Sequence, residues 1–352
     1  MTRKRLRDLG IITGRLPPGA CNAITDVPGV TVGYTTLVAD TPHIARTGVT
    51  AIWPRGDAIW GDYCFAGMHS FNGNGEMTGM AWIAEQGLLS APIGITNTYQ
   101  VGIVRDAICE LADGHNAPFH LPVVAETYDG WLHEIERFPI TRDHALAAFA
   151  TARGGAIAEG NVGGGTGKIC HEFKGGTGTA SRIADGFVVG ALVQANYGMR
   201  AQLRVDGVPV GRELGPDIVP AHRTGRAPEG GSIIVVLATN APLLPIQCQR
   251  LARRATTGLA WVGGIGGNGS GDIFLAFSTG NHITPHAPLH DVQMLAPDRM
   301  TDLFQAAAEA TEEAILNALC MAETMEGRDG RVIHALPLDQ LQQIMRRYTP
   351  AA

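Results

Sequence analysis

The chain has 352 residues, of which 45% are hydrophobic and 17% are charged, and its formal net charge is −6. This apolar share excludes intrinsic disorder, which requires low hydrophobicity and high net charge. The negative balance argues against nucleic acid as the main partner, because phosphate binding needs a clustered positive surface. No run approaches the roughly 18 uninterrupted apolar residues of a membrane span, so we expect no membrane partner.

Signals for secretion, disulfide pairing and metal binding are missing from the sequence. The N-terminal segment MTRKRLRDLGII carries charges without the apolar core of a secretory signal, so we expect a cytoplasmic protein. No two of the six cysteines form a C-x-x-C pair, and none of the twelve histidines belongs to an H-E-x-x-H motif. We therefore expect no metal site, and we interpret His69, His171 and His222 as ordinary loop or core residues.

The first half of the chain alternates short apolar runs with helical stretches. An apolar stripe at helical spacing, from Val101 to Leu111, predicts one helix, and the alanine-rich stretch Asp143–Arg153 predicts another. Apolar runs predict strands over Val30–Tyr34, Val49–Trp53, Ile93–Thr96 and Pro122–Glu126.

The second half repeats this mixed pattern. The pair Asp206-Gly207 favours a type I′ turn and predicts a hairpin over Gln202–Val210. Two nearly continuous apolar runs, Ile233–Thr239 and Ile273–Ser278, predict strands buried on both faces. Further helices are predicted over Gln247–Thr256 after Pro245, from about Asp298 to Met325, and after a capping box formed by Asp339 with Gln342. This order predicts an α+β or α/β fold whose central strands are covered by helices.

Many of the 46 glycines fall into clusters, which raises the question of a nucleotide site. The segment Gly163–Lys168 resembles a phosphate-binding loop, but Val162 and Ile169 break the required pattern. The spacing of Gly264, Gly266 and Gly269 satisfies G-x-G-x-x-G, yet a predicted strand follows where a dinucleotide site needs a helix. We therefore expect no nucleotide cofactor.

A third cluster, Gly230-Gly231, directly precedes Ser232 and the strongest predicted strand. A serine hydroxyl is a weak nucleophile until a base lies beside it, and the α-amine of an N-terminal serine is one such base. Ser232 reaches that state only if the Gly231–Ser232 bond is broken, and the stretch Arg226–Gly230 before it is permissive. On spacing alone, the simpler interpretation is favoured, namely a glycine loop that enters a strand.

Several segments together resemble the serine aminopeptidase family of L-aminopeptidase/D-esterases and β-peptidyl aminopeptidases. The resemblance covers nearly the whole chain, and its motifs are specific in combination. The segments are GNVGGGTGKICHEFKGGTGTASR (Gly160–Arg182), PVVAETYDG (Pro122–Gly130), ALVQANYG (Ala191–Gly198), GGSIIVVLATNAPLLP (Gly230–Pro245) and GSGDIFLAFSTGN (Gly269–Asn281), with RLRDLGI and GNGEMTG in support.

The resemblance implies a precursor that cleaves itself at Gly231–Ser232 into an α chain, residues 1–231, and a β chain, residues 232–352. Together the two chains would form one compact domain, a four-layer α-β-β-α sandwich of the N-terminal-nucleophile type. Four such α/β pairs would assemble into a homo-oligomer, a tetramer. The mature enzyme would release the N-terminal residue from small peptides, amides or esters through an acyl-enzyme, without a metal or other cofactor.

The resemblance also assigns the catalytic roles around Ser232, which would be the nucleophile of both self-cleavage and turnover. Asn196 would donate to the oxyanion. Ser270 and Asp272 flank Gly271 at the entry to a strand, so their side chains point to the same face. Asp272 would then orient Ser270, which would orient Ser232 or relay protons to it. Family members carry either Asp or Glu at the position of Asp272, which leaves the substrate subclass open.

Two further residues end a predicted strand and complete the expected site. Glu126 would bind the free ammonium group of the substrate, a natural role for a partly shielded carboxylate. Tyr128 would assist the acyl chemistry through its hydroxyl. The glycines of Gly163–Gly167 either carry backbone N–H groups into the site or let two segments pack closely, and the sequence leaves both readings open.

Two alternatives to the aminopeptidase or amidase reading remain. An acyltransferase on the related fold would pass the acyl group to an amine instead of water, but its usual nucleophile is threonine and Ser232 counts against it. An unprocessed binding protein would have kept the fold and lost the chemistry. Every matched catalytic position is filled, which disfavours this second alternative.

Overall fold

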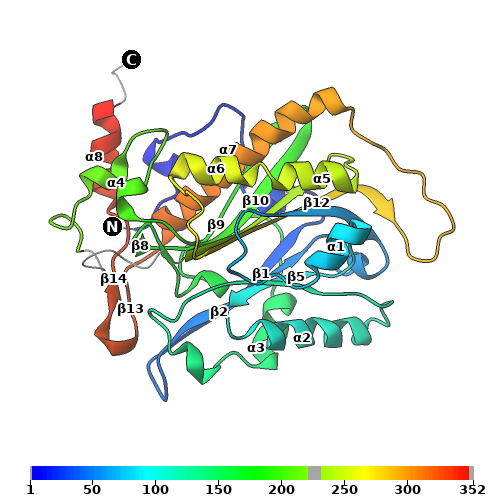
Figure 1. The fold of residues 1–352 in the computed structure, drawn as a ribbon, viewed down its shortest axis with the longest axis horizontal. Coiled ribbons are helices and arrows are strands. Elements are labelled where there is room, and N and C mark those ends of the chain that lie inside the picture. Colours follow the sequence, from blue (N-terminus) through cyan, green and yellow to red (C-terminus); the bar gives the residue numbers. More distant parts are fainter. Residues whose placement is uncertain (1, 221–230, 349–352) are drawn as a thin grey trace.

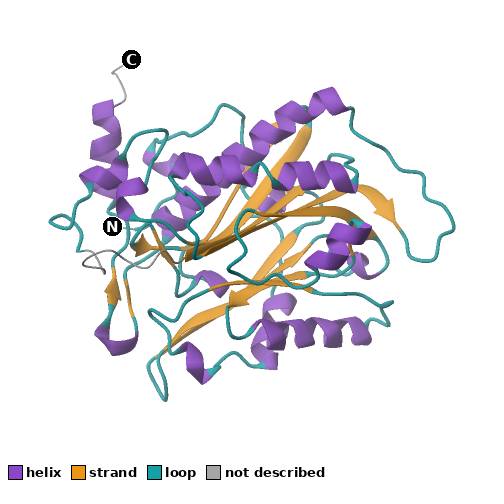
Figure 2. Ribbon diagram, viewed as in Figure 1, coloured by secondary structure: helices purple, strands orange, loops and turns teal. Residues whose placement is uncertain are grey.

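The computed structural model describes residues 2–220 and 231–348 of the chain. Two β-sheets stack face to face, and helices cover the outer face of each sheet (Figure 1 and Figure 2). The layers are α2 and α3, a four-stranded sheet, a six-stranded sheet, and α5 to α7. This arrangement confirms the predicted α-β-β-α sandwich. The permissive stretch Arg226–Gly230 and His222 lie outside the described residues.

The four-stranded sheet has the order β1-β2-β5-β6, with one parallel pair, β5 and β6. Its helices pack on the outer face, and α2 connects the two parallel strands. All four strands and both helices were predicted, with ends that differ by a few residues. The bounds are β1 Thr31–Ala39, β2 Ala45–Trp53, β5 Ile93–Asn97, β6 Val123–Thr127, α2 Val101–Gly114 and α3 Arg142–Ala150.

The six-stranded sheet has the order β4-β3-β12-β11-β10-β9, and β11 with β12 is its parallel pair. The long helix α7 packs on β9 and β10. The strand bounds are β3 Tyr63–Ser70, β4 Leu88–Leu89, β9 Gly176–Ala184, β10 Phe187–Asn196, β11 Gly231–Thr239 and β12 Ser270–Ile283. The helix bounds are α5 Pro245–Ala252, α6 Ala255–Val262 and α7 Met300–Met321.

Smaller elements lie at the edges of the sandwich. The α1 helix contacts β3, and α4 packs against α8 near the C-terminus. Two short hairpins, β7 with β8 and β13 with β14, complete the fold. The bounds are α1 Met80–Gln86, α4 Val210–Glu213, α8 Leu338–Tyr348, β7 Ile169–Cys170, β8 Phe173–Lys174, β13 Met325–Glu326 and β14 Val332–Ile333.

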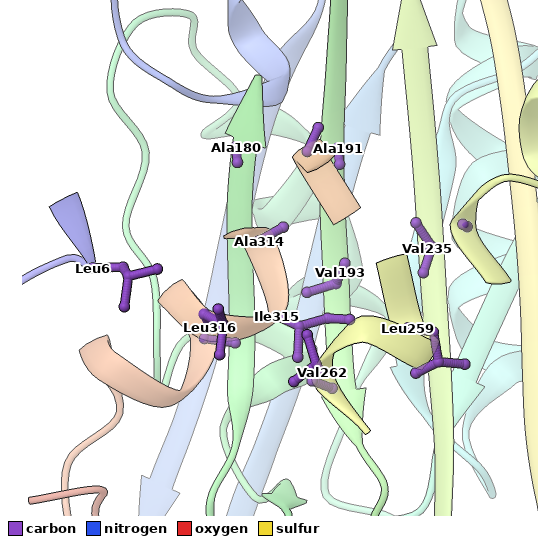
Figure 3. Close-up of a cluster of buried hydrophobic side chains, with 14 of the residues drawn as sticks. Leu6, Ala180, Ala191, Val193, Val235, Leu259, Val262, Ala314, Ile315 and Leu316 are labelled. Atoms are coloured by element: carbon purple, nitrogen blue, oxygen red, sulfur yellow. The ribbon is translucent and has the colours of Figure 1, made fainter. Parts of the chain in front are cut away.

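The continuous apolar run of β11 fills two cores, as predicted for a strand buried on both faces. Side chains alternate along a strand, so Val235 faces the helical layer and Val236 faces the other sheet. The outer core contains residues of β10, β11, α6 and α7, and Figure 3 shows Val193, Leu259 and Ile315 meeting there. The inner core lies between the two sheets. The central strands are thereby held rigidly under the site described below.

Three local predictions were wrong. The residues Asp206 and Gly207 have the positive φ values of a type I′ turn, 49° and 77°, but a single bridge flanks them and α4 follows, so no hairpin of strands forms. The predicted helix over Gln247–Thr256 is two helices, α5 and α6, separated by Arg253 and Arg254. The last helix begins at Leu338, so Asp339 lies in its first turn.

The structure also bears on membrane association and on cysteine chemistry. None of the described helices is both long and apolar enough to cross a membrane. All six cysteines are free, and four of them are buried.

Candidate active site

Three adjacent strands of the six-stranded sheet bring the expected catalytic residues into one row. In the register of the sheet, Ser232 on β11 pairs with Asn196 on β10 and with Gly271 on β12. Ser232 is 6% exposed, and its Oγ accepts a hydrogen bond from the backbone N–H of Gly271 at 3.2 Å. The hydroxyl therefore has a fixed position in the uncleaved chain.

The row opens into a cavity of about 610 Å³ between the two sheets. Five of the expected site residues line it, namely Ser232, Gly231, Asn196, Glu126 and Tyr128. Its remaining wall comes from Gly73–Glu76, Thr98, Trp131, Gly167, Ile169, Glu172, Tyr197, Gly198 and Gly269. Ser270 and Asp272 are not part of this lining.

The amide of Asn196 has one defined orientation. The backbone N–H of Ile169 donates to Asn196 Oδ1 at 2.9 Å. Because a backbone N–H can only donate, the accepting atom must be the oxygen and not the nitrogen of the side chain. The Nδ2 group is thereby directed away from Ile169 and keeps its protons for an oxygen in the cavity. This is the geometry that an oxyanion donor needs.

Ser270 and Asp272 form a hydrogen-bonded pair beside the nucleophile. Ser270 Oγ donates to Asp272 Oδ1 at 2.6 Å, and Asn72 Nδ2 donates to Asp272 Oδ2 at 3.3 Å. Burial raises the pKa of Asp272, while these hydrogen bonds oppose that rise. Strand alternation places both side chains on the face opposite that of Gly271. In the uncleaved chain, the direct contact of β12 with the Ser232 hydroxyl is therefore the Gly271 amide.

A close approach between strands requires glycine at position 231. A Cβ atom on Gly231 would lie 2.8 Å from both the carbonyl oxygen of Asn196 and the Cα of Tyr197. Both are backbone atoms, which cannot move aside without breaking the pairing of β10 with β11. On the sequence alone, glycine is expected at position 231 because it leaves the Ser232 hydroxyl unhindered. The structure adds a second reason, since a side chain here would clash with the backbone of β10.

Glu126 is a buried carboxylate at the end of β6 and is 3% exposed. The backbone N–H of Glu76 donates to its Oε1 at 3.0 Å, and the Thr98 hydroxyl donates to its Oε2. Burial raises the pKa of Glu126, and the charge of Lys168 opposes that rise. The carboxylate thus lines the cavity, and its hydrogen-bond partners in the protein are an uncharged N–H and an uncharged hydroxyl. It is therefore suited to bind a positively charged group of the substrate.

Tyr128 lines the cavity at a more exposed position. Its side chain packs against Gly130, where a Cβ atom would lie 2.2 Å from the tyrosine hydroxyl oxygen. The residue is 48% exposed, and burial of the ring raises the pKa of the phenol. Among the described residues the hydroxyl has no hydrogen-bond partner, so it is available to a ligand in the cavity.

Sequence reasoning missed the buried lysine that supports this site. Lys168 Nζ donates to the carbonyl of Thr127 at 2.5 Å and to Asp129 Oδ2 at 3.2 Å, and both Lys168 and Asp129 are buried. The lysine therefore joins the chain after Glu126 to the segment that binds Asn196. A lone lysine in a glycine-rich loop is the only local signal, and that pattern indicates a phosphate ligand, not a support for Asn196.

The glycines before this lysine mostly serve packing. Gly163–Gly165 form a buried single turn, in which the N–H groups of Gly163 and Gly164 donate to the hydroxyl oxygens of Thr36 and Thr50. Only Gly167 of this segment lines the cavity. Across the residues that the structure describes, no three His, Cys, Asp or Glu side chains come together in a way that would hold a metal ion.

Comparison with known proteins identifies the family of this chain. The model of peptidase family S58 matches residues 22–333. The β-peptidyl aminopeptidase BapA of Sphingosinicella microcystinivorans is 47% identical over 368 residues, which cover 98% of this chain and 92% of that protein. The BapA of Sphingosinicella xenopeptidilytica is 41% identical, with the same coverage.

Solved structures give the same result. A β-aminopeptidase from Burkholderia sp. is 49% identical and superposes with a TM-score of 0.92, covering 99% of this chain and 100% of its own. The L-aminopeptidase D-Ala-esterase/amidase of Ochrobactrum anthropi, a serine aminopeptidase with a variant of the Ntn hydrolase fold, is 43% identical with a TM-score of 0.90 and covers 98% of both chains. The chain belongs to peptidase family S58 and is a hydrolase of the aminopeptidase type with the N-terminal-nucleophile fold.

Proposed function

We propose that Ser232 is the nucleophile of this aminopeptidase and that the chain activates itself by cleaving the Gly231–Ser232 bond. One observation carries the proposal: Ser232 and Asn196 are register partners whose side chains line one cavity. The nucleophile and an oriented amide donor are thereby placed on adjacent strands, as acyl transfer requires.

Self-cleavage begins when Ser232 Oγ attacks the carbonyl carbon of Gly231. The peptide C–N bond breaks, the nitrogen takes a proton and becomes the α-amine of Ser232, and an ester joins Gly231 to the hydroxyl oxygen. Water then hydrolyses this ester and releases the carboxylate of Gly231. The products are an α chain, residues 1–231, and a β chain, residues 232–352.

In the mature enzyme the new α-amine of Ser232, with an ordinary pKa of about 7.7–8.0, accepts the hydroxyl proton. The hydroxyl oxygen attacks the substrate carbonyl, and Asn196 Nδ2 stabilises the oxyanion. The proton then passes to the leaving amine or alcohol, and water resolves the acyl-enzyme. Ser270 and Asp272 flank Gly271, the register partner of Ser232, and are hydrogen-bonded to each other. In this proposal they act as positioning residues for the new amine.

Glu126 explains why the enzyme requires a free N-terminus. A buried carboxylate that accepts two hydrogen bonds still has room for a third donor, and a substrate ammonium supplies it. The substrates are small peptides, amides and esters with a free amine. Because relatives at 47% and 49% identity are a β-peptidyl aminopeptidase and a β-aminopeptidase, an N-terminal β-amino acid is the first substrate to test.

Assembly into a tetramer of α/β pairs belongs to the same proposal, and light scattering of the purified protein would measure it. The activity itself is tested by incubating the purified protein with β-alanine p-nitroanilide. We expect release of p-nitroaniline by the wild-type protein and none by Ser232→Ala. Equal rates for the two proteins would refute the assignment of Ser232.

A further inference from the structure

A strained turn places Glu172 in the lining of the active-site cavity. His171 and Glu172 form the two-residue loop between β7 and β8, and both have left-handed backbone conformations, with φ values of 49° and 62°. Such a loop favours Asn-Gly, because other residues are disfavoured at positive φ. Strain of this kind gathers at functional sites, where the surrounding structure must hold it.

The contacts that hold the turn involve its backbone and His171. The N–H of His171 donates to the carbonyl of Tyr197 at 2.7 Å, and its buried ring binds the carbonyl of Met199 through Nδ1 at 3.0 Å. Arg200 Nη2 donates to the carbonyl of Glu172 at 3.2 Å. None of these bonds uses the carboxylate of Glu172, so its side chain is not needed to form the turn.

The carboxylate of Glu172 is available to a ligand. It makes no hydrogen bond or ion pair with any other residue in the described part of the chain, yet Glu172 lines the cavity. The nearby guanidinium of Arg200 already donates to three backbone carbonyls, those of Glu172, Val219 and Pro220. A second positive group is therefore free to pair with Glu172.

Glu172 and Glu126 lie on opposite sides of the nucleophile. On the β12 side, Gly75 separates Gly271 from Glu126, since a Cβ on Gly75 would lie 3.0 Å from Gly271 Cα and 3.3 Å from Glu126 Oε1. On the β10 side, the turn that carries Glu172 is bound to Tyr197 and Met199, which follow Asn196. If the substrate ammonium binds Glu126, the leaving group extends past Asn196 toward Glu172.

We propose that Glu172 forms a leaving-group subsite that selects a cationic group on the second residue of the substrate. A lysine or arginine side chain would pair with this carboxylate, whereas an acidic second residue would be repelled. The residues lining the cavity include three carboxylates, Glu76, Glu126 and Glu172, and no Lys, Arg or His among those described. This inference rests on the proposed function and adds to it the charge of the preferred leaving group.

The test compares three substrates that share one acyl residue, β-alanyl-lysinamide, β-alanyl-norleucinamide and the α-amide of β-alanyl-glutamic acid. We expect kcat/KM to fall in that order for the wild-type enzyme. Glu172→Gln lowers the preference for lysine over norleucine by about fivefold, the size of a partly exposed ion pair, and lessens the discrimination against glutamate. Added salt weakens the lysine preference of the wild type but not that of the variant.

Two further variants separate charge from the shape of the turn. Glu172→Asn removes the charge with a residue that tolerates positive φ, and it should lose the lysine preference as Glu172→Gln does. Glu76→Gln, a matched change on the other side of the cavity, should keep it. A preference unchanged in both Glu172 variants, or lost equally in Glu76→Gln, overturns the inference. A wild-type enzyme that cleaves β-alanine p-nitroanilide but none of the three substrates overturns the inference alone, whereas one that cleaves none of the four contradicts the proposed β-amino acid substrates as well.

Discussion

Asn196 and Ser232 face each other across β10 and β11 as the last pair of their antiparallel ladder. Directly opposed residues of this kind have Cβ atoms about 4.5–5.5 Å apart and side chains on one face. The amide nitrogen of Asn196 is turned away from Ile169, which holds the amide oxygen. The sheet therefore sets the distance between nucleophile and oxyanion donor, and no loop movement is needed to bring them together.

Replacing Asn196 by alanine should lower kcat by about 10²–10³, because one oxyanion donor is lost, with a smaller change in KM. Initial rates with an aminoacyl p-nitroanilide measure this. Asn161→Ala is a suitable control, since that amide pairs with the backbone of Glu323 and lies outside the cavity lining. A kcat for Asn196→Ala within twofold of the control would contradict the assigned role.

Replacing Gly231 by alanine should stop or strongly slow self-cleavage. The new methyl group would meet backbone atoms of Asn196 and Tyr197 at 2.8 Å and displace the scissile bond from Ser232. The fraction of cleaved chain is followed with time on a denaturing gel. Gly102→Ala, at a helical position where an added Cβ would have no neighbour within 4 Å, should cleave like the wild type. Normal cleavage of Gly231→Ala would show that the close approach is not needed.

Glu126→Gln should raise KM for substrates with a free amine by about 10- to 100-fold, the value of a charge-assisted hydrogen bond, while kcat changes less. Burial raises the pKa of Glu126, so the wild-type KM should begin to rise on acidification above the usual titration range of glutamate. The glutamine variant has no such group, and its KM should be flat over the same pH range. A wild-type KM that is independent of pH there would argue against Glu126 as the ammonium ligand.

A buried carboxylate away from the site makes a prediction about stability. Burial raises the pKa of Glu312 on α7 to about 7, with the charge of Asp206 adding to the rise. The folded state then keeps a proton that the unfolded state loses, so stability is full below about pH 4.5 and is lost as pH rises through 7.

Glu312→Gln removes this loss and should stabilise the protein at pH 8 by up to about 3 kcal/mol, with little effect near pH 4.5. Thermal unfolding at the two pH values measures the difference, with the exposed Glu323→Gln as control. A variant less stable than the wild type at pH 8 would show that Glu312 is charged and paired in the folded protein.

The sequence predicts β11 and β12, two of the three strands that carry the site, but it predicts neither β10, which carries Asn196, nor the edge strand β9. The apolar runs in β11 and β12 indicate doubly buried strands without reference to any partner. The strand β9 was not predicted, because its buried residues are largely polar. Arg182, for example, pairs with Glu309 at 3.1 Å and with Glu313 at 2.6 Å, both on α7 and more than a hundred residues away.

In the site, too, roles that depend on residues distant in the sequence cannot be predicted from local patterns. Ser232, Asn196 and Glu126 were found because local motifs carry them. Lys168 and Glu172 were not, since their roles depend on residues brought close only by the fold: Asp129 for the lysine, and the backbone of Tyr197 for the turn that presents Glu172. A left-handed His-Glu turn has no signature in composition or hydrophobic periodicity.

The central claim is that Ser232 becomes the first residue of a new chain and acts as the nucleophile. Mass spectrometry of the purified wild-type protein tests it most directly, beside the same measurement on Ser232→Ala. We predict two chains for the wild type, residues 1–231 and a chain that begins at Ser232, and one uncleaved chain for the variant. An active wild-type protein with an intact Gly231–Ser232 bond would contradict the account.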